Sequence, residues 1–186
     1  MLDILLKNRR SIRVYKPGII QRNVLMQILW AAVGKNNFKR TFPSAGACYP
    51  SELYVVVGEV EGIDVGIYKY DFEKSEIVKI KDGDFRQGLC NAALGQKAIL
   101  TAQVVFVVAA NYNKITKRYR RRGYRYACME VGHIGQNISL MALSLGLGTV
   151  MIGAFRDSKV KTVLGIEEEP LYIISAGLVE ELIKWS

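Results

Sequence analysis

The amino-acid sequence predicts an α+β fold, a sandwich of helices and a sheet. Short apolar runs rich in β-branched residues recur along the chain and are typical of buried strands. Segments with a helical spacing of apolar residues lie between them. Two neighbouring strand candidates can also pair as a hairpin. Helices and strands therefore alternate too irregularly for a doubly wound parallel sheet.

The first half of the chain contributes two helices and the first strand. Residues 3–8 predict a short helix. Apolar residues recur at helical spacing in residues 21–33, where Gly34 marks the end of a second helix. Residues 35–50 are rich in proline and glycine and predict a loop. The apolar, β-branched run that follows, residues 53–57, predicts a buried strand.

The middle of the chain continues with strands and one helix. Residues 62–70 and 76–81 have the composition of an antiparallel strand pair. Residues 84–94 predict a helix. Residues 104–110 are uniformly apolar and predict a second strand that is buried on both faces.

The longest predicted helix covers residues 119–145, and it is apolar on nearly all sides after Arg125. Such a helix lies at the centre of a core or between subunits. Beyond it we expect a strand at 150–152, a helix at 158–164 and a final strand at 171–176.

Length, charge and composition limit the class of protein. With 186 residues, at roughly 150 residues per domain, the chain predicts one domain over residues 1–186. Hydrophobic residues make up 50% and charged residues 23%, which argues against disorder. Lys and Arg number 26 against 17 Asp and Glu, so the net charge is +9 and favours an anionic partner.

Cysteine and histidine usage excludes several kinds of site. Cys48, Cys90 and Cys128 form no CxxC motif, which excludes a zinc ribbon, and their sparse, odd number favours the reducing cytoplasm. The single histidine, His133, excludes sites that need two histidine ligands, and we expect no metal.

No signal peptide is predicted. Residues 131–155 carry no formal charge, but their polar side chains and glycines favour a buried helix, turn and strand over a membrane span.

Two segments have the chemistry of a binding site. Arg9, Arg10, Ser11 and Arg13 place three guanidinium groups and a hydroxyl where they could bind a phosphate, although a solvated basic turn has the same composition. A second segment is a loop of small residues that would let the backbone approach a flat ligand, or would simply lead into the next strand. It consists of Pro43, Ser44, Ala45 and Gly46.

The long predicted helix carries a polar set and follows a basic run. Glu130, His133 and Asn137 share one helix face and predict a buried polar network, because no nucleophile accompanies them. Residues 114–125 interleave seven Lys and Arg with tyrosines, as single-stranded nucleic-acid binders do. A solvated helix start is the favoured interpretation. Positive charges at the start of a helix are repelled by the positive end of its dipole, and an anionic ligand nearby would offset that repulsion.

Together these segments resemble the nitroreductase family of FMN-dependent flavoenzymes. Residues 9–13 look like that family's RRSxR element, and residues 43–57 (PSAGACYPSELYVVV) look like the signature of its SagB-type dehydrogenase branch. The similarity continues through the core helix motif of residues 123–137 and the strand at residues 151–155. It runs in order from residue 7 to about residue 177.

The resemblance implies an α+β fold with a mostly antiparallel sheet sandwiched by helices and a long buried core helix. It also implies a homodimer that holds two FMN molecules at its interface. Arg9, Arg10, Ser11 and Arg13 would hold the phosphate and ribityl chain. The isoalloxazine ring would be contacted by the loop of Pro43, Ser44, Ala45 and Gly46. Ile152 and Gly153 would lie beside the flavin, with the Gly153 N–H toward N5. No side chain is expected to be catalytic, because the flavin carries the redox chemistry.

The leading functional hypothesis is an FMN-dependent oxidoreductase with a ping-pong mechanism. It would pass hydride from NAD(P)H through flavin N5 to an acceptor such as a nitroaromatic or a quinone. A second hypothesis is a dehydrogenase that oxidises a peptide azoline. The azoline-oxidising relatives carry a Lys-Tyr pair ahead of the core helix, and the nearest match here is Arg118-Tyr119. A third, from another class, is a basic nucleic-acid-binding module. The expected partners are a second copy and a small-molecule substrate rather than nucleic acid or a membrane.

Overall fold

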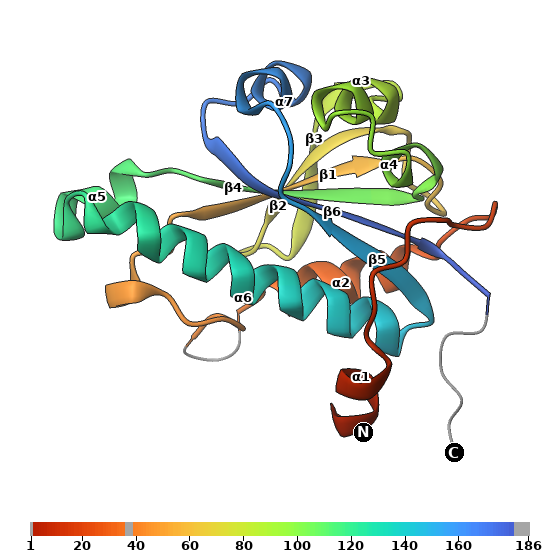
Figure 1. Ribbon diagram of the computed structural model, residues 1–186, viewed down its shortest axis with the longest axis horizontal. Coiled ribbons are helices and arrows are strands. Elements are labelled where there is room, and N and C mark those ends of the chain that lie inside the picture. The colour runs from red at the N-terminus through yellow and green to blue at the C-terminus, as the bar shows by residue number, and fades with distance from the viewer. Residues whose placement is uncertain (1, 36–38, 181–186) are drawn as a thin grey trace.

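In the part of the chain that the structure describes, six strands form one antiparallel sheet (Figure 1). The computed structural model describes residues 2–35 and 39–180. The strand order is β3-β2-β1-β4-β6-β5, and every neighbouring pair is antiparallel. The strands are β1 (Ser51–Val57), β2 (Gly66–Asp71), β3 (Glu76–Asp82), β4 (Val104–Ala110), β5 (Leu147–Ile152) and β6 (Glu169–Leu178).

Helices cover both faces of this sheet (Figure 1). One face carries α2 (Arg22–Val33) and α6 (Arg122–Ser144), with α1 (Leu2–Asn8) packed on the C-terminal half of α6. The other face carries α3 (Arg86–Ala92), α4 (Ala98–Thr101) and α7 (Asp157–Leu164). The short helix α5 (Asn113–Tyr119) precedes α6, and a 3₁₀ turn, η1 (Ala45–Ala47), lies in the loop before β1. This arrangement confirms the predicted α+β class.

The core is built by side chains that alternate between the two faces of the central strands. Every residue of β4 is buried. Phe106 packs into the cluster beneath α2 and α6, whereas its neighbours Val105 and Val107 pack beneath α3, α4 and α7. Because both faces are covered, this strand has no alternation of polar and apolar residues, as its sequence predicted.

The structure differs from the prediction at the start of the long helix. The segment expected to begin one helix at residue 119 instead ends α5 at Tyr119 and begins α6 at Arg122. Arg120 lies between them with a φ of 49°, a left-handed conformation that no helix continues through. The four-residue helix α4 was not predicted, because it is too short to show a period. Strand β2 begins at Gly66 rather than residue 62.

Helix α6 is buried on one side only. Its inner face, including Ile134 and Ile138, packs on the sheet, whereas Met129, Gly132 and His133 are exposed. Met129 is 53% exposed, and a Cβ at Gly132 would meet no atom within 4 Å. Within the described residues of one chain, therefore, α6 is an outer layer with an uncovered stripe.

In the described part of the chain, none of the helices combines the length and apolarity needed to cross a bilayer.

Candidate functional site

The N-terminal arginine segment, residues 9–13, runs along the outer edge of the sheet. The Ile12 N–H donates to the Thr149 carbonyl at 2.8 Å, and Ser11 forms a parallel bridge with Thr149. Thr149 belongs to the edge strand β5, and its hydroxyl bonds the buried Ser139 hydroxyl of α6 at 3.0 Å. The segment is therefore fixed through the backbone of β5, beside the C-terminal half of α6.

Tyr15 anchors this segment to the next strand. Its hydroxyl lies 2.9 Å from the Ile12 carbonyl oxygen and 2.9 Å from the Ser175 hydroxyl of β6. Burial of the ring raises the pKa of Tyr15 to about 12. A Cβ at Gly177 would lie 2.7 Å from the Tyr15 ring, so the ring needs a glycine beside it. This anchor holds the arginine segment flat against the sheet.

The guanidinium groups of the arginine segment are available to a ligand. Within residues 2–35 and 39–180, Arg9, Arg10 and Arg13 form no ion pair. Arg10 and Arg13 are exposed, and Arg9 is half-buried. Arg9 and Arg10 line a small hollow against Gly148 and Thr149. Unpaired guanidinium groups on a fixed backbone are well suited to bind phosphate oxygens.

The far end of the same strand carries the second predicted contact. Ile152 ends β5 and is buried, and Gly153 follows it and is exposed. A Cβ at Gly153 would meet only the Tyr172 ring, at 4.0 Å. Gly153 lies four residue steps beyond Thr149, so the arginine segment and Gly153 lie roughly 13 Å apart along one sheet edge. This suits an elongated ligand with its phosphate at one end.

The backbone is strained directly after the loop of residues 43–46, and hydrogen bonds hold it there. Gly46 has a φ of 57°, and Ala47 and Tyr49 also have positive φ, at 53° and 45°. The Ser44 hydroxyl accepts a hydrogen bond from the Tyr49 N–H at 2.9 Å. Non-glycine residues in this region cost energy, so the surrounding contacts must hold the loop in place.

The corner between α5 and α6 supplies one of those contacts. Arg118 donates from Nη1 to the Gly46 carbonyl at 3.0 Å. A Cβ at Gly46 would lie 2.5 Å from the Tyr119 hydroxyl and 2.9 Å from the Arg118 guanidinium. Both the left-handed φ and the close approach therefore require glycine at this position.

Two side chains of α6 hold the flanks of the loop. Buried Glu130 accepts a hydrogen bond at Oε1 from the Ser51 N–H at 3.2 Å. Asn137 donates from Nδ2 to the carbonyls of Thr41 and Ala31, at 3.2 and 3.1 Å. The interpretation of these two residues as structural is confirmed, and both act on the loop. Sequence reasoning could not identify their partners, because these are distant in the chain. Ser51 lies 79 residues from Glu130, and Thr41 lies 96 residues from Asn137.

The prediction that His133 joins this polar network is wrong. His133 is exposed, whereas Glu130 is 1% exposed. Three residues of an α-helix turn about 300°, so His133 lies roughly 60° around the helix from Glu130. Asn137, seven residues from Glu130, returns to nearly the same direction and faces the loop.

The predicted cofactor residues form two separate groups within one chain. The loop of residues 43–46 contacts Arg118 and Tyr119, just before α6 begins, whereas the arginine segment lies beside Ser139 and Thr149. From Arg122 to Ser139 the helix advances roughly 25 Å. Figure 1 shows the N-terminal segment and the loop before β1 near opposite ends of α6. We call the first group, with Ile152 and Gly153, the arginine half-site, and residues 43–46 the loop half-site.

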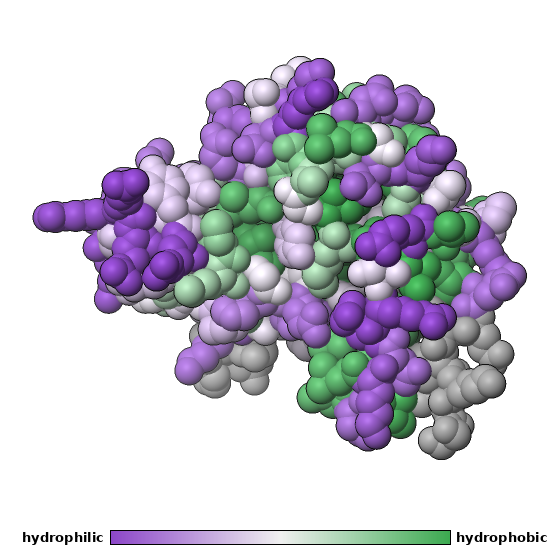
Figure 2. Space-filling view, viewed as in Figure 1, coloured by the Kyte–Doolittle hydropathy of each residue, from purple (hydrophilic) through white to green (hydrophobic). Residues whose placement is uncertain are grey.

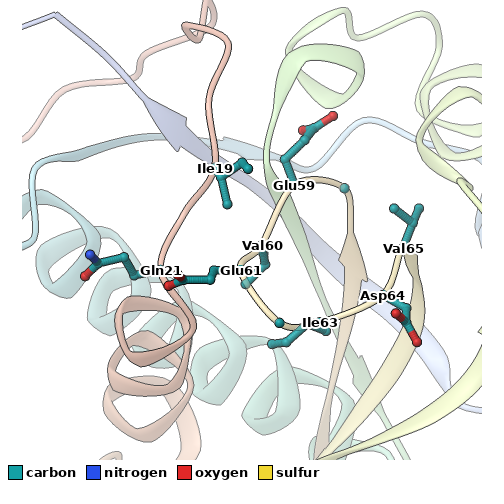
Figure 3. A pocket seen from close by; sticks show the side chains of 10 residues that line it. Ile19, Gln21, Glu59, Val60, Glu61, Ile63, Asp64 and Val65 are labelled. Atoms are coloured by element: carbon teal, nitrogen blue, oxygen red, sulfur yellow. The ribbon is translucent and has the colours of Figure 1, made fainter.

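A pocket elsewhere on the surface does not involve either half-site. It has a volume of about 680 Å³ and is lined by residues of the β1–β2 connection together with Ile19 and Gln21 (Figure 3). Its charged side chains are the carboxylates of Glu59, Glu61 and Asp64. This acidic lining is unsuited to a phosphate. Among the described residues, no group of His, Cys, Asp and Glu is arranged to hold a metal ion.

Comparison with known proteins gives the family. Residues 6–178 match the model of the nitroreductase family. The chain belongs to this family of oxidoreductases. It is 46% identical over 177 residues to MJ1384 of Methanocaldococcus jannaschii, provisionally named a nitroreductase, and the match covers 94% of this chain and 89% of that protein. It is 25% identical to the Microcin B17-processing protein McbC of Escherichia coli, covering 94% of this chain and 65% of that one.

Solved structures support the same assignment. A protein of Anabaena variabilis, provisionally assigned as a nitroreductase, superposes with a TM-score of 0.81 at 28% identity. The match covers 95% of this nitroreductase-family chain and 38% of the Anabaena variabilis chain. The NADPH:FMN oxidoreductase of Vibrio harveyi, in complex with NAD⁺, superposes with a TM-score of 0.69 at 18% identity. The match covers 96% of this chain and 68% of the Vibrio harveyi chain. At that identity, the second likeness supports the fold alone.

Proposed function

We propose that the chain is an FMN-dependent oxidoreductase whose flavin site combines the arginine half-site of one copy with the loop half-site of a second. The observation that carries this proposal is the separation of the two half-sites at opposite ends of α6. A two-fold axis perpendicular to α6, through its exposed stripe, would exchange the ends of the helix. It would thereby bring the loop half-site of one copy toward the arginine half-site of the other.

The exposed stripe of α6 suits such an interface. Met129 offers apolar surface, and Gly132 leaves room for a close approach by a second backbone. An interface of this kind has the same patch on both copies. Each homodimer would then contain two equivalent sites, each incomplete in a single chain.

The residues present fit FMN in charge and shape. The unpaired guanidinium groups of Arg9, Arg10 and Arg13 neutralise a phosphate, and the Ser11 hydroxyl adds a donor. On the loop half-site, Pro43, Ser44, Ala45 and Gly46 present little side-chain bulk to a flat ring. Beside Ile152, the missing side chain of Gly153 lets the backbone amide approach the ring edge.

When bound, FMN supplies N5 as the site that takes hydride from a reduced nicotinamide and passes it to an acceptor such as a nitroaromatic or a quinone. The protein binds and orients the ring, and a donor at Gly153 N–H favours the reduced flavin. No side chain needs to act as acid or base in this account. The three cysteines are free, which agrees with a reducing compartment such as the cytoplasm.

A second candidate function is oxidation of an azoline in a peptide, as in the SagB-type branch. The observation that favours it is the contact between Arg118-Tyr119 and Gly46, which places this pair at the loop half-site. The name of McbC links that relative to microcin processing. Anaerobic bleaching of bound flavin by azoline peptides, without nicotinamide, would favour this function over the first.

The proposed function is tested by the absorption spectrum of the purified protein and the mass of any ligand released on denaturation. We expect a flavin spectrum, the mass of FMN and anaerobic bleaching by reduced nicotinamide. Initial-rate lines for the two substrates should be parallel, as a ping-pong scheme requires. A colourless protein that also fails to bind added FMN would contradict the proposal.

A further inference from the structure

A dense group of cations lies at the junction of α5 and α6, and we call it the arginine corner. It consists of Lys117, Arg118, Arg120, Arg121, Arg122 and Arg125, all of which are exposed. Figure 2 shows hydrophilic side chains gathered at this end of the molecule, over α5 and the start of α6. No Asp or Glu occurs from residue 111 to residue 129.

The arginine corner is electrostatically unfavourable in the isolated chain. Arg118 bonds a backbone carbonyl, and the other five cations form no ion pair with the residues the structure describes. Arg121 and Arg122 also stand at the first turn of α6, where the helix dipole disfavours positive charge. Arg120 adds a strained backbone, with a φ of 49°. An anion bound here would offset the mutual repulsion and the dipole together.

The position of the corner connects it to the flavin site. Arg118 and Tyr119 contact Gly46, so the corner is continuous with the half-site proposed to face the isoalloxazine ring. The arginine half-site, which would take the FMN phosphate, lies at the other end of α6. A second phosphate-binding group beside the ring therefore serves the substrate rather than the cofactor.

We propose that the arginine corner binds the 2′-phosphate of the reductant, so that the protein uses NADPH in preference to NADH. This inference rests on the proposed oxidoreductase function and names its substrate. The 2′-phosphate is the one chemical difference between the two nicotinamide dinucleotides, and guanidinium forks match its oxygens. Arg121 and Arg122 are consecutive residues, the N-cap and the first residue of α6, and both side chains are exposed at this helix start.

The test compares the wild-type protein with the double variant Arg121→Gln/Arg122→Gln. In the wild type we expect kcat/KM for NADPH to exceed that for NADH by at least about tenfold, the effect of one charge-assisted hydrogen bond. In the variant, the NADPH value should fall by about tenfold or more while the NADH value stays unchanged. The matched control is Lys97→Gln/Lys159→Gln, which removes two exposed cations from the opposite face of the sheet. It should leave both values unchanged.

A binding measurement separates this inference from the proposed function. Calorimetry with 2′,5′-ADP and with 5′-AMP reports recognition of the 2′-phosphate without any turnover, and FMN content is measured on the same samples. Tighter binding of 2′,5′-ADP that is lost in the variant supports the inference. Equal use of NADPH and NADH by an FMN-loaded protein overturns it and leaves the oxidoreductase function intact. It is also overturned if the variant loses salt-dependent RNA binding but keeps its NADPH kinetics.

Discussion

The two half-sites are held in place by different kinds of interaction. The arginine half-site is fixed by backbone hydrogen bonds to β5 and by the buried Tyr15 hydroxyl. The loop half-site rests on side chains, with Glu130, Asn137 and Arg118 each contributing hydrogen bonds to its backbone or its flanks. The arginine half-site is therefore an extension of the sheet, whereas the loop half-site depends on individual side chains of α5 and α6.

This difference predicts which substitutions affect binding, stability or both. The cations of the arginine half-site form no ion pair with the residues that the structure describes, so their removal should weaken ligand binding with little effect on folding. Side chains that hold the loop are buried or strained, so their removal should affect both. The predictions below test this contrast from the largest expected effect to the smallest.

The largest effect is expected from Arg9→Ala/Arg13→Ala. Loss of two charge-assisted hydrogen bonds to a phosphate should weaken FMN binding by roughly a thousandfold. The melting temperature of the FMN-free protein should change little, because neither side chain has an ion-pair partner among the described residues. Fluorescence titration with FMN measures the affinity. The control Arg22→Ala removes an exposed cation at the start of α2 and should leave affinity unchanged.

The second effect concerns Gly46→Ala at the loop half-site. A Cβ would lie 2.5 Å from the Tyr119 hydroxyl, so the loop must shift, and FMN affinity should fall by about ten- to a hundredfold. The free energy of unfolding should fall by about 1–2 kcal/mol because of the left-handed φ. Gly62→Ala is a matched control. Its φ is +66°, nothing lies within 4 Å of its Cβ, and it is remote from both half-sites. It should show the stability loss without the loss of affinity.

The third prediction distinguishes the role of Glu130 as a hydrogen-bond acceptor from the role of its negative charge. Glu130→Gln retains an oxygen that can accept from the Ser51 N–H, whereas Glu130→Ala leaves that buried donor without a partner. We expect Glu130→Ala to lower the free energy of unfolding by about 1–3 kcal/mol and FMN affinity by about tenfold. Glu130→Gln should be closer to wild type in both. Equal losses in the two variants would show that the hydrogen bond to Ser51 is not what holds the loop.

The smallest effect is expected from Tyr15→Phe, which removes the hydroxyl that links Ile12 to Ser175. Stability should fall by about 1 kcal/mol, and FMN affinity only a fewfold, because backbone bonds still hold the segment. The pKa of Tyr15 is raised to about 12 by burial, so its contribution to stability is complete below pH 10 and is lost as pH rises toward 12. The free energy of unfolding, measured by denaturation at several pH values between about 9 and 12, should therefore fall less steeply with pH for Tyr15→Phe than for the wild type.

The fold was largely predictable because its main elements are encoded locally. Strand β4 coincides with the predicted range of residues 104–110, and Gly34 ends α2 as expected. The break at Arg120 was not predictable, since an arginine with positive φ leaves no compositional trace. The tie from Tyr15 to Ser175 spans 160 residues and depends on tertiary packing.

The sequence indicates which residues are candidates for the site but not how they are arranged. Arg9 and Gly46 stand out by motif, yet the sequence does not indicate that α6 separates them. That separation depends on which end of the helix each segment meets, which the packing of β5 and of the loop decides.

The central claim, a flavin site shared between two copies, is tested most directly by mixing two defective variants. Arg9→Ala/Arg13→Ala carries an intact loop half-site, and Gly46→Ala carries an intact arginine half-site. Mixed dimers are isolated by two affinity tags, and their FMN content is compared with that of each variant alone. We predict that every mixed dimer regains one of its two sites with wild-type affinity. If both half-sites act within one chain, no mixed dimer holds an intact site, and a flavin content no higher than that of the separate variants would contradict the account.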